Sequence, residues 1–308
     1  MSVRCGYFSK DLLYSFHSQE RKMGGIDFAF LDSGTGGIPY MLALKEKMPG
    51  GRCVYLGDTL HFPYGEKSPE EVTRCASDTI RLIVEKWHPH TIVIACNTIS
   101  VTSLDDLRSL FPHTPIVGTV PAIKLAASVT RNKKIGLLAT NATVQHPYCR
   151  RLTRDFASDC QVFSRGDPDL IAFIEHDLFT ATEEEKMAAV APAVDYFASH
   201  GCDTIILGCT HFTHVAKEIA IAAGSAVQVV DSREGVANQA IRVETKKTAE
   251  SEENPKSESS LHSAASDLAA GLPADNTFFV TACTPVDEAE YRTLCKGYGI
   301  PWGGLVQD

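Results

Sequence analysis

Two cysteines follow nearly identical apolar segments and could together move a proton on both faces of one carbon atom. The segment Thr91-Ile-Val-Ile-Ala-Cys-Asn-Thr98 is echoed 113 residues later by Thr204-Ile-Ile-Leu-Gly-Cys-Thr-His211. Each begins with β-branched and aliphatic residues typical of a buried strand and ends in a thiol followed by small polar side chains. A thiol can donate a proton and a thiolate can accept one. The pair Cys96 and Cys209 therefore predicts acid–base chemistry at one shared site.

The residues upstream of the two thiols match as well, which indicates a duplicated unit. Phe28-Ala-Phe-Leu-Asp-Ser-Gly34 precedes Cys96, and Lys134-Ile-Gly-Leu-Leu-Ala-Thr140 precedes Cys209 at a similar distance. Open α/β sheets bind ligands at the carboxyl ends of their strands, where both thiols are expected. A helix is expected after each thiol, and its N-terminal dipole would lower a thiol pKa. The remaining cysteines lack these features and are interpreted as structural: Cys5, Cys53, Cys75, Cys149, Cys160, Cys202, Cys283 and Cys295.

Composition and charge are those of a soluble globular protein. The 308 residues are 44% hydrophobic and 22% charged, and they suffice for two domains of ordinary size. The net charge of −9 argues against nucleic acid or an anionic membrane as the main partner, because neither would attract it. No apolar run approaches the length of a membrane span, and charged residues between Lys10 and Lys22 interrupt any secretory leader. The ten cysteines are interpreted as reduced thiols, which predicts a cytoplasmic protein.

Short apolar runs alternate with helical patterns from Ile26 onward, which predicts an α/β fold with parallel strands joined by crossover helices. Strands are expected at 26–31, 53–57, 91–95, 115–118, 134–139, 161–164, 204–208, 227–230 and 277–281. Helices are expected at 37–47, 69–86, 101–110, 182–199 and 213–223.

The same patterns predict an extension, two domains and an insertion. Residues 1–25 have mixed polarity and no clear period. The first domain is expected to comprise 26–121 and 231–308, because 278–281 is typical of a lone strand that is followed by one helix; the second comprises 122–230. Residues 245–276 are rich in Ser, Glu, Lys and Ala and are interpreted as a solvated surface insertion, with a regulatory segment as the alternative.

The loop Asp32-Ser-Gly-Thr-Gly-Gly37 follows the first strand and opens a helix. A phosphate loop would need Gly-Lys-Ser/Thr, and a dinucleotide fingerprint would need glycine where Pro39 stands, so neither fits. One interpretation is that the loop N–H groups and the Ser33 hydroxyl bind a carboxylate, while Asp32 contacts an ammonium group or orients a thiol. The alternative is a plain tight turn.

Cys209-Thr-His211-Phe-Thr-His214 contains metal-ligand types at short spacing, but no zinc-type spacing accompanies them, and we predict no metal. His211 is instead interpreted as a base or charge partner of Cys209, and His214 as an ordinary packing or surface residue. Glu175 lies in an apolar stretch and needs a partner, for which His211 is a candidate. Tyr64 and Gly65, in a turn-rich loop, could present an aromatic wall and a backbone N–H to a ligand.

Taken together, these pieces resemble the glutamate racemases of the aspartate/glutamate racemase superfamily. Their order and spacing hold from about Ile26 to Asn238, and Phe278 to Lys296 resembles the C-terminal strand and helix of that family. The matching pieces are Asp32-Ser-Gly-x-Gly-Gly37, Gly57-Asp-Thr59, Pro63-Tyr-Gly65, Ala95-Cys-Asn-Thr98, Val117-Gly118, Pro121-Ala122, Thr140 with Ala142-Thr143, Gly208-Cys-Thr-His211 and Val230-Asp-Ser232. Residues 1–25 and 245–276 depart from the usual pattern of the family.

The resemblance implies two pseudo-symmetric, doubly wound parallel-sheet domains with the active site between them. It implies a cofactor-independent two-base racemase of L- and D-glutamate that supplies D-glutamate for peptidoglycan in the bacterial cytoplasm, with a homodimer as the assembly to test. Cys96 and Cys209 would be the catalytic residues, and Asp32, Glu175 and His211 would support them. Substrate binding or thiol orientation would fall to Asp32, Ser33, Tyr64, Gly65, Asn97, Thr98, Thr140, Thr143, Thr210 and His211.

Two other readings of the same residues stay open at this point. One is a superfamily relative acting on aspartate, a hydantoin or a malonate, although the related aspartate racemases usually have glutamate where His211 stands. The other is a thiol-containing binding or regulatory protein without activity, against which the intact cysteine pair argues. A panel of amino acids assayed for loss of optical rotation separates these readings.

Overall fold

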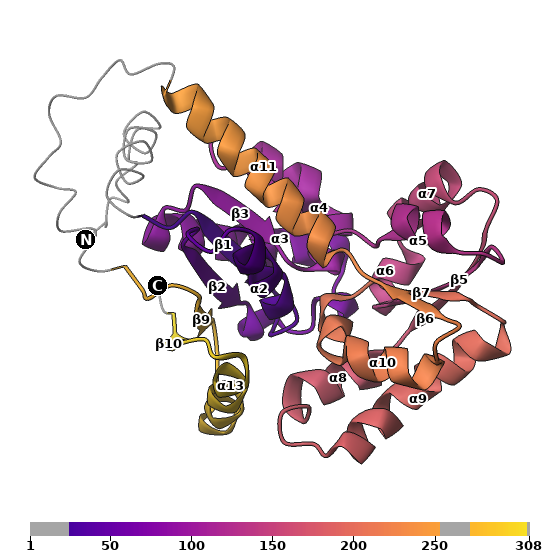
Figure 1. Ribbon diagram of the computed structural model, residues 1–308. Helices are drawn as coiled ribbons and strands as arrows, with labels where there is room; N and C mark the ends of the chain where they lie inside the picture. The colour runs from indigo at the N-terminus through magenta and orange to yellow at the C-terminus, as the bar shows by residue number, and fades with distance from the viewer. Residues whose placement is uncertain (1–24, 253–271, 307–308) are drawn as a thin grey trace, which may run out of the picture.

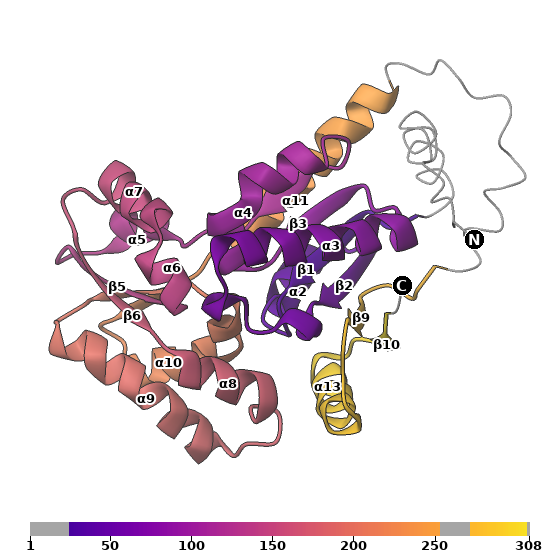
Figure 2. The same cartoon turned by 180° about the vertical axis from the view of Figure 1, so that it is seen from behind.

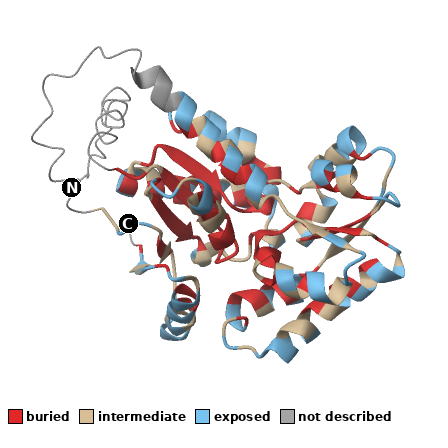
Figure 3. Cartoon of the chain, in the orientation of Figure 1, coloured by how far each residue is buried: buried red, intermediate tan, exposed pale blue. Residues whose placement is uncertain are grey.

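The computed structural model describes residues 25–252 and 272–306 (Figure 1). Nearly all of the predicted extension 1–25, including Cys5, and the centre of the predicted insertion lie outside these ranges. The described residues form two lobes that stand side by side, each built on a parallel β-sheet with helices on both faces (Figures 1 and 2). This is the predicted α/β class, and the inner strands are buried because helices cover both faces of each sheet (Figure 3).

The first lobe contains a six-stranded sheet in the order β10-β9-β2-β1-β3-β4, and the second contains a four-stranded sheet in the order β6-β5-β7-β8. The strands of the first sheet are β1 Phe28–Asp32, β2 Cys53–Gly57, β3 Thr91–Ile94, β4 Ile116–Gly118, β9 Thr277–Val280 and β10 Trp302–Leu305. Those of the second are β5 Lys134–Ala139, β6 Gln161–Gly166, β7 Thr204–Leu207 and β8 Gln228–Val230. Every strand pairing among the described residues is parallel, as the alternation of strand and helix patterns predicts.

The two sheets repeat one topology. The order β2-β1-β3-β4 in the first sheet corresponds to β6-β5-β7-β8 in the second. In the first, Leu31 pairs with Ile94; in the second, Leu138 pairs with Leu207. The duplication seen in the sequence therefore has a structural counterpart, and it places Cys96 and Cys209 at equivalent strand ends.

The helices of the first lobe are α2 Ile38–Lys47, α3 Pro69–Trp87, α4 Asn97–Leu110, α11 Arg233–Glu252 and α13 Pro285–Tyr298. Those of the second are α5 Ile123–Val129, α6 Asn141–Gln145, α7 Pro147–Phe156, α8 Pro168–His176, α9 Glu183–Ser199 and α10 Ala216–Ala223. Three short 3₁₀ segments also occur in the described part of the chain: η2 Thr59–His61, η3 Tyr64–Glu66 and η4 Thr210–Val215.

Alternating side chains of each strand enter opposite cores. Phe28 and Phe30 of β1 pack with α2, α11 and α13, while Ala29 and Leu31 pack with α3 and α4. In the second lobe, Leu138 faces α8, α9 and α10, and the neighbouring side chains of β5 face α5 and α7. This doubly wound arrangement leaves the carboxyl ends of the strands as the places where loops can build a site.

One prediction about the C-terminal part of the chain was wrong. The segment after β9 is not one strand and one helix, because β10 follows α13 and adds the outermost strand of the first sheet. Its residues, Trp302-Gly-Gly-Leu305, carry no alternation of apolar and polar side chains, so the pairing with β9 is what defines the strand. The helices named from the sequence did not include α5, α6, α7, α8 and α11.

The predicted insertion begins too early and ends too late. Helix α11 continues through 245–252, which the sequence had assigned to the insertion; good helix formers such as Ala, Glu and Lys sustain it. At the other end, the Asp275 carboxylate accepts a hydrogen bond from the Cys53 N–H (2.9 Å) and forms an ion pair with Lys45 (2.6 Å), so Asp275 belongs to the first lobe and not to the insertion. The insertion that remains is 253–271, which lies outside the described residues.

We expect a Gly/Ser segment of equal length in place of residues 254–270 to leave the free energy of unfolding within about 0.5 kcal/mol of the wild type. The reason is compositional, since this stretch has few large apolar residues. Asp275→Ala serves as the contrast and should cost about 1–2 kcal/mol, because it removes a hydrogen bond and an ion pair at the start of β9. Urea unfolding measures the free energy of unfolding of both variants. A loss above 2 kcal/mol in the Gly/Ser variant would contradict the compositional argument.

We propose that the two lobes are the two predicted domains, 26–121 with 231–308 and 122–230. The chain crosses between the sheets after β4 and again after β8, where these limits fall. No helix among residues 25–252 and 272–306 combines the length and apolar character needed to cross a membrane. The cysteines of the same ranges are free thiols.

Candidate active site

Both thiols line one cavity between the lobes. Cys96 stands two residues after β3 at the N-cap position of α4, and Cys209 stands two residues after β7 at the start of η4. The cavity they share has a volume of about 120 Å³, a size that suits an amino acid and not a nucleotide. The predicted residues that line it with the two cysteines are Ser33, Tyr64, Gly65, Asn97, Thr98, Thr140, Thr210 and His211.

Three predicted site residues lie behind the cavity wall instead of in it: Asp32, Thr143 and Glu175. The Thr143 N–H donates to the Thr140 hydroxyl oxygen (3.1 Å), so Thr140 caps the N-terminus of α6 and Thr143 holds it in place. Thr140 in turn meets Thr98 across the lobes, with 3.0 Å between their hydroxyl oxygens. The predicted substrate contact of Thr143 is therefore better described as support for Thr140.

The first half of the site pairs Cys96 with Asp32. Asp32 is fully buried; one carboxylate oxygen accepts from the Ser33 N–H (2.8 Å) and the other from the Thr210 hydroxyl (3.2 Å). Burial raises the pKa of Asp32, against the lowering effect of the charge on His211. Burial also raises the pKa of Cys96 well above its usual value, and the neighbouring Asp32 charge adds to this.

This direction corrects the expectation that a helix N-terminus would lower the pKa at this position. Cys96 does cap α4, but it is 5% exposed and faces a carboxylate. The cost of removing a thiolate from water exceeds what one helix dipole returns. Cys96 is consequently held as a thiol that carries its proton.

The second half of the site is a chain of buried polar contacts behind Cys209. Its Sγ lies 3.7 Å from Nδ1 of His211, and Nε2 of His211 donates to Oε2 of Glu175 (2.9 Å). Burial disfavours a charge on His211, but the contacts with Cys209 and Glu175 outweigh it and hold the His211 pKa well above its usual value. Burial likewise opposes the charge on Glu175, yet hydrogen bonds from His211 and Thr35 lower its pKa to about 2. The expected contact between Glu175 and His211 is thus present, with a protonated imidazole facing the sulfur.

Glycines of the loop Asp32–Gly37 allow these groups to approach. A Cβ on Gly34 would lie 2.6 Å from Oε1 of Glu175, and a Cβ on Gly36 would lie 2.6 Å from Nδ1 of His211. Any larger residue would displace the carboxylate or the imidazole. Tyr55 fixes the loop from below, because its hydroxyl donates to the Gly34 carbonyl oxygen (2.8 Å) and accepts from the Gly37 N–H (2.9 Å). The loop is therefore a built element of the site and not a plain turn.

Tyr64 and Gly65 enter the cavity wall from η3. The Tyr64 hydroxyl donates to Asp58 (2.5 Å), whose carboxylate also accepts from Thr79 (2.9 Å) and Thr281 (2.8 Å). This cluster anchors the loop between β2 and α3. Gly65 lies against Thr140, where a Cβ would come within 3.0 Å of the Thr140 Cβ.

Sequence reasoning missed several residues of the site. Thr35 donates to Oε2 of Glu175 with both its N–H (3.0 Å) and its hydroxyl (2.7 Å). Phe62 packs on the His211 ring with 5.9 Å between centroids. The other wall residues that were not predicted are Pro63, Glu66, Asn141, Pro168, Ile171 and Ala172. The signal for the last three was available, since they share helix α8 with Glu175 at helical spacing.

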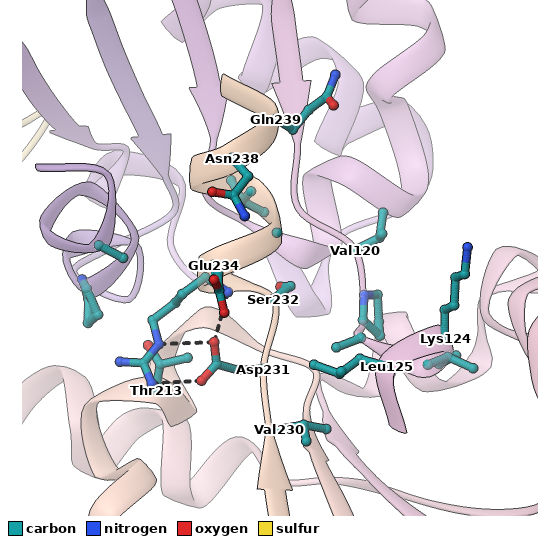
Figure 4. Close-up of a pocket in the computed structure, with 18 of the residues that line it drawn as sticks. Val120, Lys124, Leu125, Thr213, Val230, Asp231, Ser232, Glu234, Asn238 and Gln239 are labelled. Atoms are coloured by element: carbon teal, nitrogen blue, oxygen red, sulfur yellow. Dashed lines mark hydrogen bonds and ion pairs between the residues drawn. The ribbon is translucent and has the colours of Figure 1, made fainter. Parts of the chain in front are cut away.

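A second, larger cavity of about 1580 Å³ lies where the chain crosses between the lobes (Figure 4). It is lined by residues of both crossings, among them Val120, Lys124, Asp231 and Ser232. The Arg233 guanidinium binds the Asp231 carboxylate there at 2.7 Å and 3.0 Å. Neither thiol reaches this cavity, so the smaller one holds the chemistry.

The ring nitrogens that could have bound a metal beside Cys209 have protein partners. His211 contacts Cys209 and Glu175, and His214 contacts Tyr298 (2.6 Å) and the Thr35 carbonyl oxygen (3.1 Å). Metal-ligand types also gather at the opposite end of the first sheet. There, Nδ1 of His90 lies 3.3 Å from both Asp27 and Glu244, where it fastens α11 to the sheet.

Comparisons with known proteins agree with this geometry. The sequence profile described as Asp/Glu/Hydantoin racemase matches residues 41–240. A protein described as glutamate racemase from Treponema pallidum (strain Nichols) is 40% identical over 216 residues, which cover 70% of this chain and 80% of the relative. The corresponding protein of Glaesserella parasuis serovar 5 is 39% identical over 211 residues, covering 68% and 78%.

Solved structures are similar over almost the whole fold. The crystal structure of Escherichia coli glutamate racemase in complex with L-glutamate and the activator UDP-MurNAc-ala has a TM-score of 0.69 at 28% identity, covering 91% of this chain and 97% of that one. The Francisella tularensis enzyme in complex with D-glutamate has a TM-score of 0.68 at 20% identity, covering 92% and 97%, and supports the fold alone. A profile match over well over half of the chain, together with relatives near 40% identity, establishes that this protein belongs to the Asp/Glu/Hydantoin racemase family.

Proposed function

We propose that this protein racemises glutamate by a two-base mechanism in which Cys96 and Cys209 exchange protons with opposite faces of the α-carbon. The observation that carries the proposal is an amino-acid-sized cavity lined by both thiols, each with its own buried carboxylate behind it. The relatives described as glutamate racemase support glutamate as the substrate. D-glutamate made in this way would serve peptidoglycan synthesis in the cytoplasm.

The polar lining suits an amino-acid zwitterion. No Lys or Arg occurs among the described residues that line the cavity, so carboxylates of the substrate would be held by hydroxyls, the Asn97 amide and backbone N–H groups. The N-terminus of α4, which begins at Asn97, adds a favourable dipole for an anion. Asp32, behind Ser33, would balance the α-ammonium charge.

The reaction then needs one proton removed and another delivered. With L-glutamate, the Cys209 thiolate would take the α-proton and become a thiol, while the Cys96 thiol would give its proton to the other face and become a thiolate. D-glutamate would follow the reverse course. Positioned acids and bases typically contribute about 10²–10⁴-fold each. Hydrogen bonds to the α-carboxylate and the retained ammonium charge would stabilise the carbanion between the two steps.

The two halves of the site differ in charge. His211, kept protonated by Cys209 and Glu175, places a positive charge beside the Cys209 sulfur, while burial and Asp32 keep Cys96 as a thiol. Chiral chromatography of L-glutamate and of L-aspartate after incubation with the pure protein tests the proposal. D-glutamate should accumulate to equal amounts of both enantiomers, and preferential turnover of aspartate would reject glutamate as the substrate.

We expect racemisation to need no added cofactor, because thiols and hydrogen-bond donors can supply each step named above. Activity should remain after extended dialysis against a chelator, and the protein should show no pyridoxal absorption band. The measurement is the rate of D-glutamate formation before and after dialysis. Loss of activity that zinc or pyridoxal phosphate restores would overturn this prediction.

The predicted homodimer is a further part of the proposal. Sedimentation equilibrium of the purified chain measures it directly. A mass near 33.5 kDa would indicate a monomer.

A further inference from the structure

His214 and Tyr298 connect the two lobes at a point next to the active site. His214 belongs to η4 in the second lobe, and Tyr298 is the last residue of α13 in the first. Nδ1 of His214 lies 2.6 Å from the Tyr298 hydroxyl, and its Nε2 lies 3.1 Å from the carbonyl oxygen of Thr35, in the first-lobe loop that follows β1. Phe179, from the loop after α8, packs against both rings at 6.1 Å and 5.5 Å.

The hydrogens of this contact have one consistent arrangement. A carbonyl oxygen can only accept, so Nε2 of His214 must carry the hydrogen that reaches Thr35. Burial, aided by the neighbouring His211 charge, lowers the pKa of His214 to about 3, so the ring is neutral and Nδ1 is an acceptor. The Tyr298 hydroxyl is then the donor to Nδ1.

Thr35 links His214 to the half of the site that contains Cys209. Its N–H and its hydroxyl both donate to Oε2 of Glu175, the same oxygen that accepts from His211. Oε1 of Glu175 has no hydrogen-bond partner in the described part of the chain. The alignment of the carboxylate with His211 therefore depends on where Thr35 is held, and His214 holds its carbonyl oxygen.

We propose that His214 and Tyr298 form an interlobe brace that fixes Thr35 against Glu175 and so positions His211 beside Cys209. Both are positioning residues, because neither lines the cavity of the thiols. The inference rests on the proposed function, since its consequence is the protonation and placement of a group next to a reacting sulfur. It also replaces the sequence interpretation of His214 as an ordinary packing or surface residue.

A pair of amide substitutions separates the two bonds of His214. In His214→Gln the amide nitrogen reaches the position of Nε2 and can still donate to the Thr35 carbonyl oxygen. In His214→Asn the shorter amide reaches only the position of Nδ1, so the donor to Thr35 is lost. We expect kcat/KM for glutamate to stay within about 3-fold of wild type for the first and to fall about 10–30-fold for the second. Tyr298→Phe should lie between them, because it removes the hydroxyl and leaves Nε2 in place.

The matched control is Tyr291→Phe on the same helix. Tyr291 is buried, and no side-chain hydrogen bond of its hydroxyl occurs within residues 25–252 and 272–306. This variant should keep wild-type kcat/KM and pH dependence. Circular dichroism and thermal unfolding confirm that each variant is folded.

The decisive measurement is the protonation state of His211 as a function of pH. Imidazole ¹⁵N NMR monitors this state and does not require the enzyme to turn over. Loss of the brace weakens the contact with Glu175, so the His211 pKa should move to lower pH in His214→Asn and stay in place in His214→Gln. The alkaline limb of kcat/KM should move in the same direction. Equal losses of activity in the two amide variants, with no change in the His211 titration, would contradict the proposal. They would show that His214 contributes packing and does not position His211. A wild type that titrates as described but does not racemise glutamate would reject the proposed function and leave the brace supported.

Discussion

Changing either Cys96 or Cys209 to alanine should lower racemisation of glutamate by at least about 1000-fold, because one face of the α-carbon loses its proton carrier. The equilibrium constant between enantiomers is unity, so kcat/KM must fall equally for L- and D-glutamate in each variant. The loss should appear in kcat, while glutamate still protects the protein against thermal unfolding, since the thiols contribute little to the polar contacts that would hold it.

Isotope exchange gives each thiol its own signature. In deuterated water the wild type should place solvent deuterium in the product enantiomer early and leave recovered substrate largely unlabelled, because the donor differs from the acceptor. In Cys209→Ala any residual exchange should be confined to D-glutamate, and in Cys96→Ala to L-glutamate. Near-normal racemisation by Cys209→Ala, or equal exchange of both enantiomers through one cysteine, would be incompatible with two bases.

Two other cysteines serve as controls. Cys75 packs in the core between the first sheet and α3, and Cys283 lies in the loop after β9. Neither lines the cavity of the thiols. Alanine at either position should leave kcat/KM within about 2-fold of wild type, with a stability cost near 1 kcal/mol for the buried Cys75.

Glu175→Gln should lower kcat/KM about 100-fold and the free energy of unfolding by about 3 kcal/mol at pH 6, because a buried imidazolium loses its charged partner. Glutamine keeps the size of the side chain and can still accept from Thr35, so the change isolates the charge. Without that charge the His211 pKa falls. The alkaline limb of kcat/KM should therefore move to lower pH than in the wild type.

The pH dependence of the unfolding free energy follows from the pKa shifts of His211 and Glu175. His211 has a raised pKa in the folded state, so its contribution is full below its unfolded value of about 6.5 and is lost as pH rises through the folded value. Glu175 has a lowered pKa, so its contribution is full above its unfolded value of about 4.3 and is lost as pH falls toward about 2. The difference in unfolding free energy between wild type and Glu175→Gln should peak between about pH 5 and 6.5.

A more accessible pair of the same two residue types provides the comparison. Glu290 lies 3.6 Å from His176, and water screens their interaction because the two side chains are 30% and 49% exposed. Glu290→Gln should change the unfolding free energy by less than about 0.5 kcal/mol and leave the pH profile of activity unaltered. Urea denaturation between pH 2 and pH 9 measures both variants. A flat difference for Glu175→Gln across this range would mean that the pair is not ionised in the folded protein.

The sequence by itself determined the parts of this protein that depend on local pattern. Apolar runs of four to six residues, followed by turn residues and helical periodicity, located nine of the strands within a residue or two at most ends. Strand ends in a parallel sheet gather at one edge, so the same pattern placed Asp32 near Cys96. The site between two domains that also includes Cys209 was implied by the family resemblance. The internal repeat supplied the equivalence of the two thiols, which the matching strand orders reproduce.

Only the tertiary structure decided the features that depend on partners distant in the chain. β10 is a strand because β9 lies beside it. Tyr55 matters because the loop after β1 folds over it, and Thr35 matters because Glu175 of the second lobe lies beside it. The direction of the Cys96 pKa is the clearest case. Sequence shows a helix start, which lowers a thiol pKa, but burial and a facing carboxylate arise from the packing of two lobes and are the larger effect. Electrostatic character is set by what surrounds a group in space, and that information is not present in any local run of residues.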